Sequence, residues 1–223
     1  MAPTPPSRTA LLAGASGLVG RALLPLLLRT HASVDVLVRR AVPGLAADPR
    51  ARLRVVDFAS LPAPFPAVDD VFIALGTTIA VAGSQAAFRA VDFDAVVDTA
   101  KASRAAGATR LAIVSALGAD ARSRVFYNQV KGEMEQAVAA LGFDSVAIAR
   151  PSLLFGDRAA LGQPVRSGEV WAARLTRPFG WLVPRAVRPI AAGDVAAALV
   201  RTTGQGAPGL HFLSSAAMQG AGG

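Results

Sequence analysis

Cysteine is absent from this 223-residue sequence, and histidine occurs only twice, as His31 and His211. Without cysteine there is no disulfide framework, no thiol chemistry and no thiolate metal site. The two histidines lie far apart and neither accompanies a pair of carboxylates, so we expect both at the surface or at strand ends. The sequence therefore predicts no metal centre.

Runs of basic residues are also absent, although the formal net charge is +8 and the isoelectric point is about 11.4. The basic residues are mostly arginines, and they are dispersed and not interleaved with aromatic residues. Nucleic-acid-binding proteins gather such residues in patches. We therefore expect no nucleic-acid partner, and we attribute the excess charge to composition and to attraction for anionic small molecules.

A long apolar stretch over residues 9–28 follows Arg8 and resembles a signal peptide or a membrane span. Three spaced glycines, Arg21, Pro25 and the lack of a small-residue cleavage site argue against both interpretations. A buried parallel strand followed by its covering helix explains the same residues. The sequence therefore predicts no membrane association and a cytoplasmic location.

Short apolar runs alternate with helical patterns, which predicts an α/β protein with a Rossmann-type, doubly wound, mainly parallel sheet of six or seven strands. Continuous apolar runs are typical of parallel strands covered on both faces. The expected strands are Thr9–Ala13, Val34–Val38, Leu53–Val56, Val71–Ala74, Leu111–Val114, Val146–Ala149 and, with a weaker pattern, Leu210–Leu213. The expected helices are Leu18–Arg29, Ser84–Ala106, Arg124–Leu141 and Gly193–Thr202. Pro25 should kink the first helix or end its regular hydrogen bonding early.

The alternation breaks between Gly156 and Arg188, where four prolines lie in or beside a stretch that holds both tryptophans and six arginines. Such a segment cannot form a central strand, so we predict a small C-terminal substrate lobe or lid at about residues 156–189. Residues 214–223 are small and glycine-rich and are expected to form a flexible tail. Since no repeat or linker is visible, residues 1–223 are predicted to form a single domain.

A glycine-rich turn, Gly14-Ala-Ser-Gly-Leu-Val-Gly20, joins the first expected strand to the first expected helix. Spaced glycines in this context allow a tight turn, a close approach of backbone N–H groups to a dinucleotide pyrophosphate, and close packing of helix on strand. The helix N-terminus then favours the phosphate charge. Such turns also occur as plain loops, but the strand–helix context favours a dinucleotide site. Its expected contact residues are Gly14, Ser16, Gly17, Leu18 and Val19.

Two arginines, Arg39 and Arg40, end the second expected strand, where NAD-binding proteins carry a carboxylate for the ribose 2′-hydroxyl. A guanidinium there would bind a 2′-phosphate with charge assistance, so the sequence favours NADP(H) over NAD(H). The alternative is a pair of solvated arginines. Residues expected to border the adenine are Asp57 and Phe58, and those expected to line the adenosine-ribose side are Leu75, Gly76, Thr77 and Thr78.

Tyr127 and Lys131 lie four residues apart in an expected helix and therefore share one helix face. A nearby cation favours the phenolate form of tyrosine, which suits an acid–base catalyst. Ser115 ends the fifth expected strand, at the edge where open α/β sheets bind ligands. Each feature alone also fits a solvated helix or a turn serine. Their combination, in this order after a glycine turn, is far more specific.

From about Thr9 to Leu213 the sequence resembles the short-chain dehydrogenase/reductase superfamily, specifically its atypical, Tat-interactive-protein-like NAD(P)-binding oxidoreductases. The segment around Tyr127 is the most distinctive of those that carry the resemblance. The segments are Gly14-Ala-Ser-Gly-Leu-Val-Gly20, Val56-Asp-Phe58, Leu75-Gly-Thr-Thr78, Ser115-Ala-Leu-Gly-Ala-Asp120, Tyr127-Asn-Gln-Val-Lys-Gly-Glu133 and Arg150-Pro-Ser-Leu-Leu154. A C-terminal pattern at Ile190–Val195 resembles extended members.

The resemblance implies NADP(H) as cofactor and a Ser–Tyr–Lys catalytic set. Ser115 would hydrogen-bond the substrate oxygen, Tyr127 would be the general acid/base, and Lys131 would hold the nicotinamide ribose and tune Tyr127. Tyr127 and Lys131 would also both contact the cofactor. The main chain of Pro151, Leu153 and Leu154 would wall the nicotinamide pocket. Many members carry an asparagine where this chain has Val91-Asp-Phe-Asp94, which leaves open whether Asp92 takes part in a proton relay.

Three functions remain open at this point. The intact Ser–Tyr–Lys set favours an oxidoreductase that reduces a carbonyl or oxidises an alcohol. A protein that binds NADPH and reports redox state to a partner need not keep that set. A nucleotide-sugar epimerase is disfavoured because the lobe is short. Monomer and homodimer are both open.

The substrate pocket is expected to be mostly apolar, with several arginines nearby. This mixture suggests a hydrophobic carbonyl compound with an anionic group held by one arginine. Ordinary solvated arginines explain the same residues equally well. The expected lining is Ser115–Leu117, Tyr127, Leu153–Asp157 and the Trp171–Trp181 lobe, with Arg158, Arg166, Arg174 and Arg185 close by.

Overall fold

The centre of the protein is a seven-stranded sheet in which every neighbouring pair is parallel, in the order β3-β2-β1-β4-β5-β6-β9. The computed structural model describes residues 7–155 apart from 43 and 46, residue 184, and residues 186–221. The strands are β1 (Thr9–Ala13), β2 (Ser33–Val38), β3 (Ala51–Val55), β4 (Asp70–Ile73), β5 (Arg110–Val114), β6 (Ser145–Arg150) and β9 (Gly209–Ser214). The prediction of a doubly wound α/β fold is confirmed.

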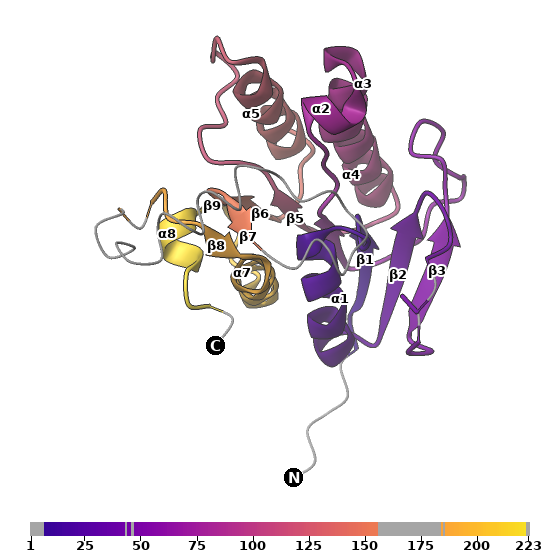
Figure 1. Cartoon of the computed structure of the whole chain (residues 1–223). Coiled ribbons are helices and arrows are strands. Elements are labelled where there is room, and N and C mark those ends of the chain that lie inside the picture. The colour runs from indigo at the N-terminus through magenta and orange to yellow at the C-terminus, as the bar shows by residue number, and fades with distance from the viewer. Residues whose placement is uncertain (1–6, 43, 46, 156–183, 185, 222–223) are drawn as a thin grey trace.

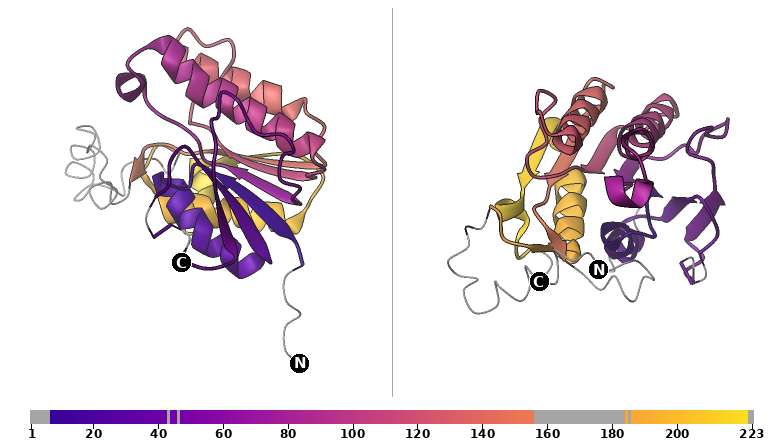
Figure 2. Two further views of the ribbon diagram at one scale, coloured as in Figure 1. Left: turned by 90° about the vertical axis from the view of Figure 1, so that its right-hand side faces the viewer. Right: turned by 45° about the horizontal axis from the view of Figure 1, so that its top comes forward.

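Helices cover both faces of this sheet (Figures 1 and 2). One layer is formed by α1 (Leu18–Thr30) and α7 (Ala192–Gln205), and the other by α4 (Ala95–Ala105) and α5 (Phe126–Ala139). The shorter elements are α2 (Ile79–Ala82), α3 (Gln85–Arg89), a π-helical turn at Ala90–Asp94, and α8 (Ser215–Met218). No helix in the described part of the chain has the length and apolar character needed to cross a bilayer.

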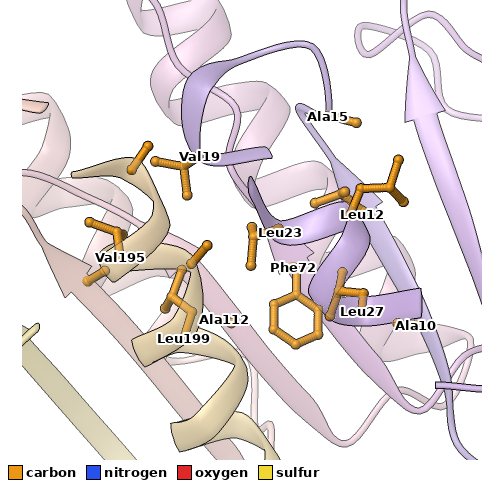
Figure 3. Packing of buried hydrophobic residues seen from close by; sticks show 14 of the residues in the cluster. Ala10, Leu12, Ala15, Val19, Leu23, Leu27, Phe72, Ala112, Val195 and Leu199 are labelled. Carbon is orange, nitrogen blue, oxygen red and sulfur yellow. The ribbon is translucent and has the colours of Figure 1, made fainter. Parts of the chain in front are cut away.

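Two hydrophobic cores lie on the two faces of the sheet, because the central strands are buried on both sides. In the core shown in Figure 3, Leu23 of α1 lies next to Phe72 of β4, and Val195 of α7 belongs to the same cluster. The edge strands are different. β9 exposes Leu210 and Phe212, since no helix covers that part of the sheet among the described residues.

The first helix differs from the expectation for Pro25. Regular helix extends through Pro25 to Thr30, so the expected early end is wrong. Pro25 is exposed, and the carbonyl of Arg21, which loses its intrahelical donor there, lies on the same exposed side. Solvent can therefore replace the missing hydrogen bond.

The expected single helix over residues 84–106 is instead α3, the π-helical turn and α4 in direct succession. The π-helical turn inserts about one extra residue into the helix. The side chains that follow it are therefore turned to a different direction around the helix axis. The buried residue of this turn is Asp92. No pattern of apolar residues indicates this interruption.

Residues 214–221 correct the prediction of a flexible tail over 214–223, whose last two residues lie outside the described part of the chain. Ser214 ends β9 and caps α8, accepting a hydrogen bond from the N–H of Ala217. Ser215 and Met218 are buried, and Met218 belongs to the core beneath α1 and α7. Met218 and Ser215, whose hydroxyl is 2.9 Å from that of Ser152, thus dock a segment whose composition suggested disorder.

The expected substrate lobe at residues 156–189 lies mostly outside the described residues, as do Trp171, Trp181 and the four arginines assigned to it. The ends of the segment are described. Leu154–Phe155 (β7) pairs in parallel with Ile190–Ala191 (β8), and Ser152 donates a hydrogen bond to the carbonyl of Arg188. The two ends therefore meet beside the end of β6.

A buried carboxylate lies at the amino-terminal end of the central strand β4. Asp70, at the start of β4, accepts two hydrogen bonds from Arg8 and is 3.0 Å from Nε2 of His31. Burial opposes its ionisation, but the hydrogen bonds from His31 and Arg8 outweigh burial, so the pKa of Asp70 lies below its usual range. His31, which we expected at the surface or a strand end, is buried there against Phe72.

Candidate active site

The glycine turn lies at the C-terminal end of β1, between β1 and α1. Gly14 has φ +92°, and a Cβ there would be 2.5 Å from the carbonyl of Ala74. A Cβ on Gly20 would be 2.1 Å from the carbonyl oxygen of Gly14. Both positions require glycine because backbone atoms occupy the space. At Gly17 the nearest atom would be 3.5 Å away, so that glycine is not required by packing.

The N-terminus of α1 is suited to hold phosphate. Gly17 caps the helix without a side-chain hydrogen bond, and no acidic residue stands in the first turn. The N–H groups of the first turn therefore remain available to an anion. Val19 is buried in the core, so it and Leu18 would contribute backbone there, while Ser16 is exposed in the turn. The residues present fit a pyrophosphate.

Arg39 and Arg40 are both exposed at the C-terminal end of β2. Neither forms an ion pair or hydrogen bond within the part of the chain that the structure describes. The carboxylate within β2, Asp35, is buried and paired with Arg54 of β3. The strand end therefore offers positive charge and no unpaired carboxylate for a ribose hydroxyl.

The loops after β3 and β4 contain the residues expected around the adenosine. Asp57 is exposed and accepts a hydrogen bond from the N–H of Ala59. Phe58 and Leu75 pack against the core beneath α4 and α5. The Thr78 hydroxyl accepts from Val81 and so caps α2, a role that the sequence did not reveal.

Lys131 and Asp92 form a buried ion pair. Nζ of Lys131 lies 2.7 Å from Oδ1 of Asp92, and the two side chains are 4% and 1% exposed. The other carboxylate oxygen accepts a hydrogen bond of 2.8 Å from the N–H of Thr77. A Cβ on Gly76 would be 3.3 Å from Asp92, so this glycine lets the loop come close. The pair thus ties α5 to the loop after β4.

Tyr127 precedes Lys131 by one helical turn, on the same face of α5. Its ring lies 5.4 Å from that of Phe88, measured between centroids. Phe88 is fully buried and so fixes the ring from one side.

Ser115 follows β5 directly and is 4% exposed. Its hydroxyl has no hydrogen-bond partner among the described residues. Its N–H donates to the carbonyl of Ala149, and the N–H of Leu117 donates to the carbonyl of Pro151. The expected catalytic loop and the expected nicotinamide wall are therefore hydrogen-bonded neighbours. Leu153 and Leu154 follow at the partly exposed start of β7.

The other residues of the distinctive segment around Tyr127 have structural roles. Glu133 accepts from Arg89 of α3 and from Gln129. Gly132 packs directly on the preceding loop, since a Cβ there would be 2.1 Å from the backbone nitrogen of Ala121. The segment therefore fixes α5 in place as well as supplying Tyr127 and Lys131.

The fold and the glycine turn together define a dinucleotide-binding protein of the Rossmann type. Residues 14–171 match a sequence family described as NAD(P)H-binding, and the chain belongs to that family. The resemblance to atypical short-chain dehydrogenases/reductases is confirmed.

Similar curated proteins include FMP52 of Eremothecium gossypii, 40% identical over 67% of this chain and 67% of its own length. FMP52 of Emericella nidulans is 36% identical over 66% of this chain and 67% of its own. Protein HTATIP2 of Rattus norvegicus is 36% identical over 75% of this chain and 69% of its own.

Among solved structures, MoeE5 in complex with UDP-glucuronic acid and NAD aligns with a TM-score of 0.70 at 19% identity, over 92% of this chain and 75% of that one. The Helicobacter pylori ADP-L-glycero-D-manno-heptose-6-epimerase aligns with a TM-score of 0.69 at 16% identity, over 93% and 77%. At these identities the likeness shows the fold.

The prediction of a cytoplasmic location is contradicted, because the FMP52 relatives are named as mitochondrial proteins. Features of residues 9–28 that exclude a secretory signal or a membrane span do not bear on mitochondrial import.

Asp92 is the functional candidate whose contacts sequence reasoning did not foresee. Its position drew notice only as a departure from asparagine. The contact with Lys131 depends on the π-helical turn and on the packing of that turn against α5. The available signal was an aspartate within an otherwise apolar helix face.

Proposed function

We propose that this chain is an NADP(H)-dependent oxidoreductase that reduces a carbonyl compound to an alcohol, or catalyses the reverse reaction. The observation that carries this proposal is the Ser115 hydroxyl. It is buried and has no hydrogen-bond partner among the described residues, although leaving a buried hydroxyl unpaired costs about 1–3 kcal/mol. A substrate oxygen would satisfy it.

Tyr127, Ser115 and Lys131 have separate roles in the proposed reaction. When bound, the reduced nicotinamide supplies a hydride. Tyr127 donates its proton to the oxygen that becomes a hydroxyl, and Ser115 donates a hydrogen bond to the same oxygen. The ammonium of Lys131 stabilises the phenolate left on Tyr127. Little water screens the ammonium because it is buried, although its partner Asp92 offsets part of the charge.

The preference for NADP(H) is supported by the exposed guanidinium groups of Arg39 and Arg40, which have no acidic partner in the described part of the chain. Arg39→Ala should weaken NADPH binding roughly ten- to a hundredfold, the loss expected for one charge-assisted contact, and should leave NADH binding nearly unchanged. Titration calorimetry with both cofactors measures this. Equal wild-type affinity for NADPH and NADH would reverse the assignment.

A panel of carbonyl compounds assayed for NADPH oxidation tests the catalytic proposal. Tyr127→Phe is the matched variant, because it removes one hydroxyl and keeps the ring contact with Phe88. The variant should bind NADPH as the wild type does and turn over about 10²–10⁴-fold more slowly. If the wild type reduces no compound in the panel and Tyr127→Phe binds NADPH unchanged, the alternative of a cofactor-binding regulator is favoured over the oxidoreductase.

A further inference from the structure

The charge of Lys131 depends on one carboxylate. Its ammonium is nearly inaccessible to solvent, and Asp92 is its one acidic partner within the described part of the chain. An isolated buried ammonium strongly favours the neutral amine, whereas an opposite charge in contact restores the charged form. Asp92 is itself fixed by the N–H of Thr77, so it cannot easily turn away.

Other charged groups near α5 are paired elsewhere or exposed. On the elements packed against α5, Lys101 is near Asp98 on α4, and Asp94 is exposed in the π-helical turn. The remaining pairs are Arg89–Glu133, Arg150–Glu135 and Arg122–Asp120. None of these groups is in ion-pair contact with Lys131.

Three separate features converge on this contact. The π-helical turn at Ala90–Asp94 brings Asp92 to the buried side, and such turns are frequent at functional sites. Gly76 leaves room for the carboxylate, and Thr77 holds it. These features place the ion pair one helical turn from Tyr127 on α5.

We propose that Asp92 is a positioning residue whose carboxylate holds the buried ammonium of Lys131 in place and stabilises its charge, so that Lys131 can act on Tyr127. The part that concerns Tyr127 rests on the proposed oxidoreductase function. The part that concerns Lys131 does not. An amide at position 92 would keep an acceptor for Thr77 but would lose the charge.

The chain offers a direct readout because it contains two lysines, Lys101 and Lys131. Lysine labelled with carbon-13 at Cε therefore gives two side-chain signals in a nuclear magnetic resonance spectrum. In Asp92→Asn, the pH response of the Lys131 signal should move to lower pH than in the wild type, because the opposite charge in contact is lost. Lys101, which is 59% exposed, serves as the internal control and should not move. An unchanged Lys131 titration would overturn the proposal.

A double-mutant cycle covers the case in which Asp92→Asn folds poorly. If an unpaired Lys131 causes the loss of stability, then adding Lys131→Met should restore most of it, because no buried charge remains. Additive losses in the double variant would overturn the proposal.

The experiments distinguish failure of the oxidoreductase proposal from failure of the proposed role of Asp92. The titration of Lys131 needs neither cofactor nor substrate, so a shifted signal without any turnover refutes only the oxidoreductase. With turnover, Asp92→Asn should lose activity above the pH at which its Lys131 deprotonates and regain it below. A rate lowered equally at every pH would refute the positioning role.

Discussion

Two alanine substitutions in the glycine turn, three residues apart, should have different effects. One should lower the stability of the fold, and the other should lower the affinity for the cofactor. In Gly20→Ala the new Cβ would lie 2.1 Å from the oxygen and 2.7 Å from the carbon of the Gly14 carbonyl. Backbone atoms cannot rotate away, so α1 must move off β1. Overpacking of this kind costs about 3 kcal/mol, which for a domain of this size lowers the melting temperature by roughly 6–12 °C.

Gly17→Ala is the matched control, because its Cβ would meet nothing closer than 3.5 Å and its φ of −82° suits alanine. Its stability should stay within about 1 kcal/mol of the wild type. The added methyl would occupy the space in front of α1, so NADPH binding should weaken about tenfold or more. Urea unfolding and calorimetric titration measure the two effects. Equal stability losses, or full cofactor affinity in Gly17→Ala, would refute this assignment of roles.

Two further predictions concern stability. Asp70→Asn should cost about 2 kcal/mol at neutral pH. Because the pKa of Asp70 is lower in the folded than in the unfolded chain, the carboxylate stabilises the fold above its unfolded pKa, near about pH 4, and this stabilisation is lost as pH falls through the folded value. The wild-type advantage should therefore shrink below about pH 4 in urea titrations, and a constant difference would contradict the shift. Met218→Ala should cost about 2 kcal/mol by the same assay, whereas a frayed C-terminus would give no change.

The fold was predictable because most of its strands are short, continuous apolar runs bounded by polar or glycine residues. Thr9–Ala13 was expected with the bounds that β1 has, since a continuous apolar run in a parallel sheet is buried on both faces. The alternation of strands and helices predicted a mainly parallel sheet of six or seven strands, and the structure has seven. Local sequence patterns alone predict these strands and helices, so the prediction required no knowledge of tertiary contacts.

The departures come from residues whose environment is set by distant parts of the chain. Met218 holds α8 because it meets the core formed by α1 and α7, which composition alone does not show. The π-helical turn likewise depends on packing against α5. In the site, Ser115, Tyr127 and Lys131 were marked by spacing and position, whereas the link from Asp92 to Lys131 required the folded structure.

The central claim is that Tyr127 and Ser115 serve a hydride transfer from NADPH to a carbonyl carbon. The most direct measurement incubates the protein with NADPH deuterated at the transferred position of nicotinamide C4 and with the best carbonyl of the panel, followed by mass spectrometry of the alcohol. We expect one deuterium on the carbinol carbon with the wild type, and about 10²–10⁴-fold slower formation of that product with Tyr127→Phe. An alcohol without deuterium, or equal rates for the two proteins, would contradict the account.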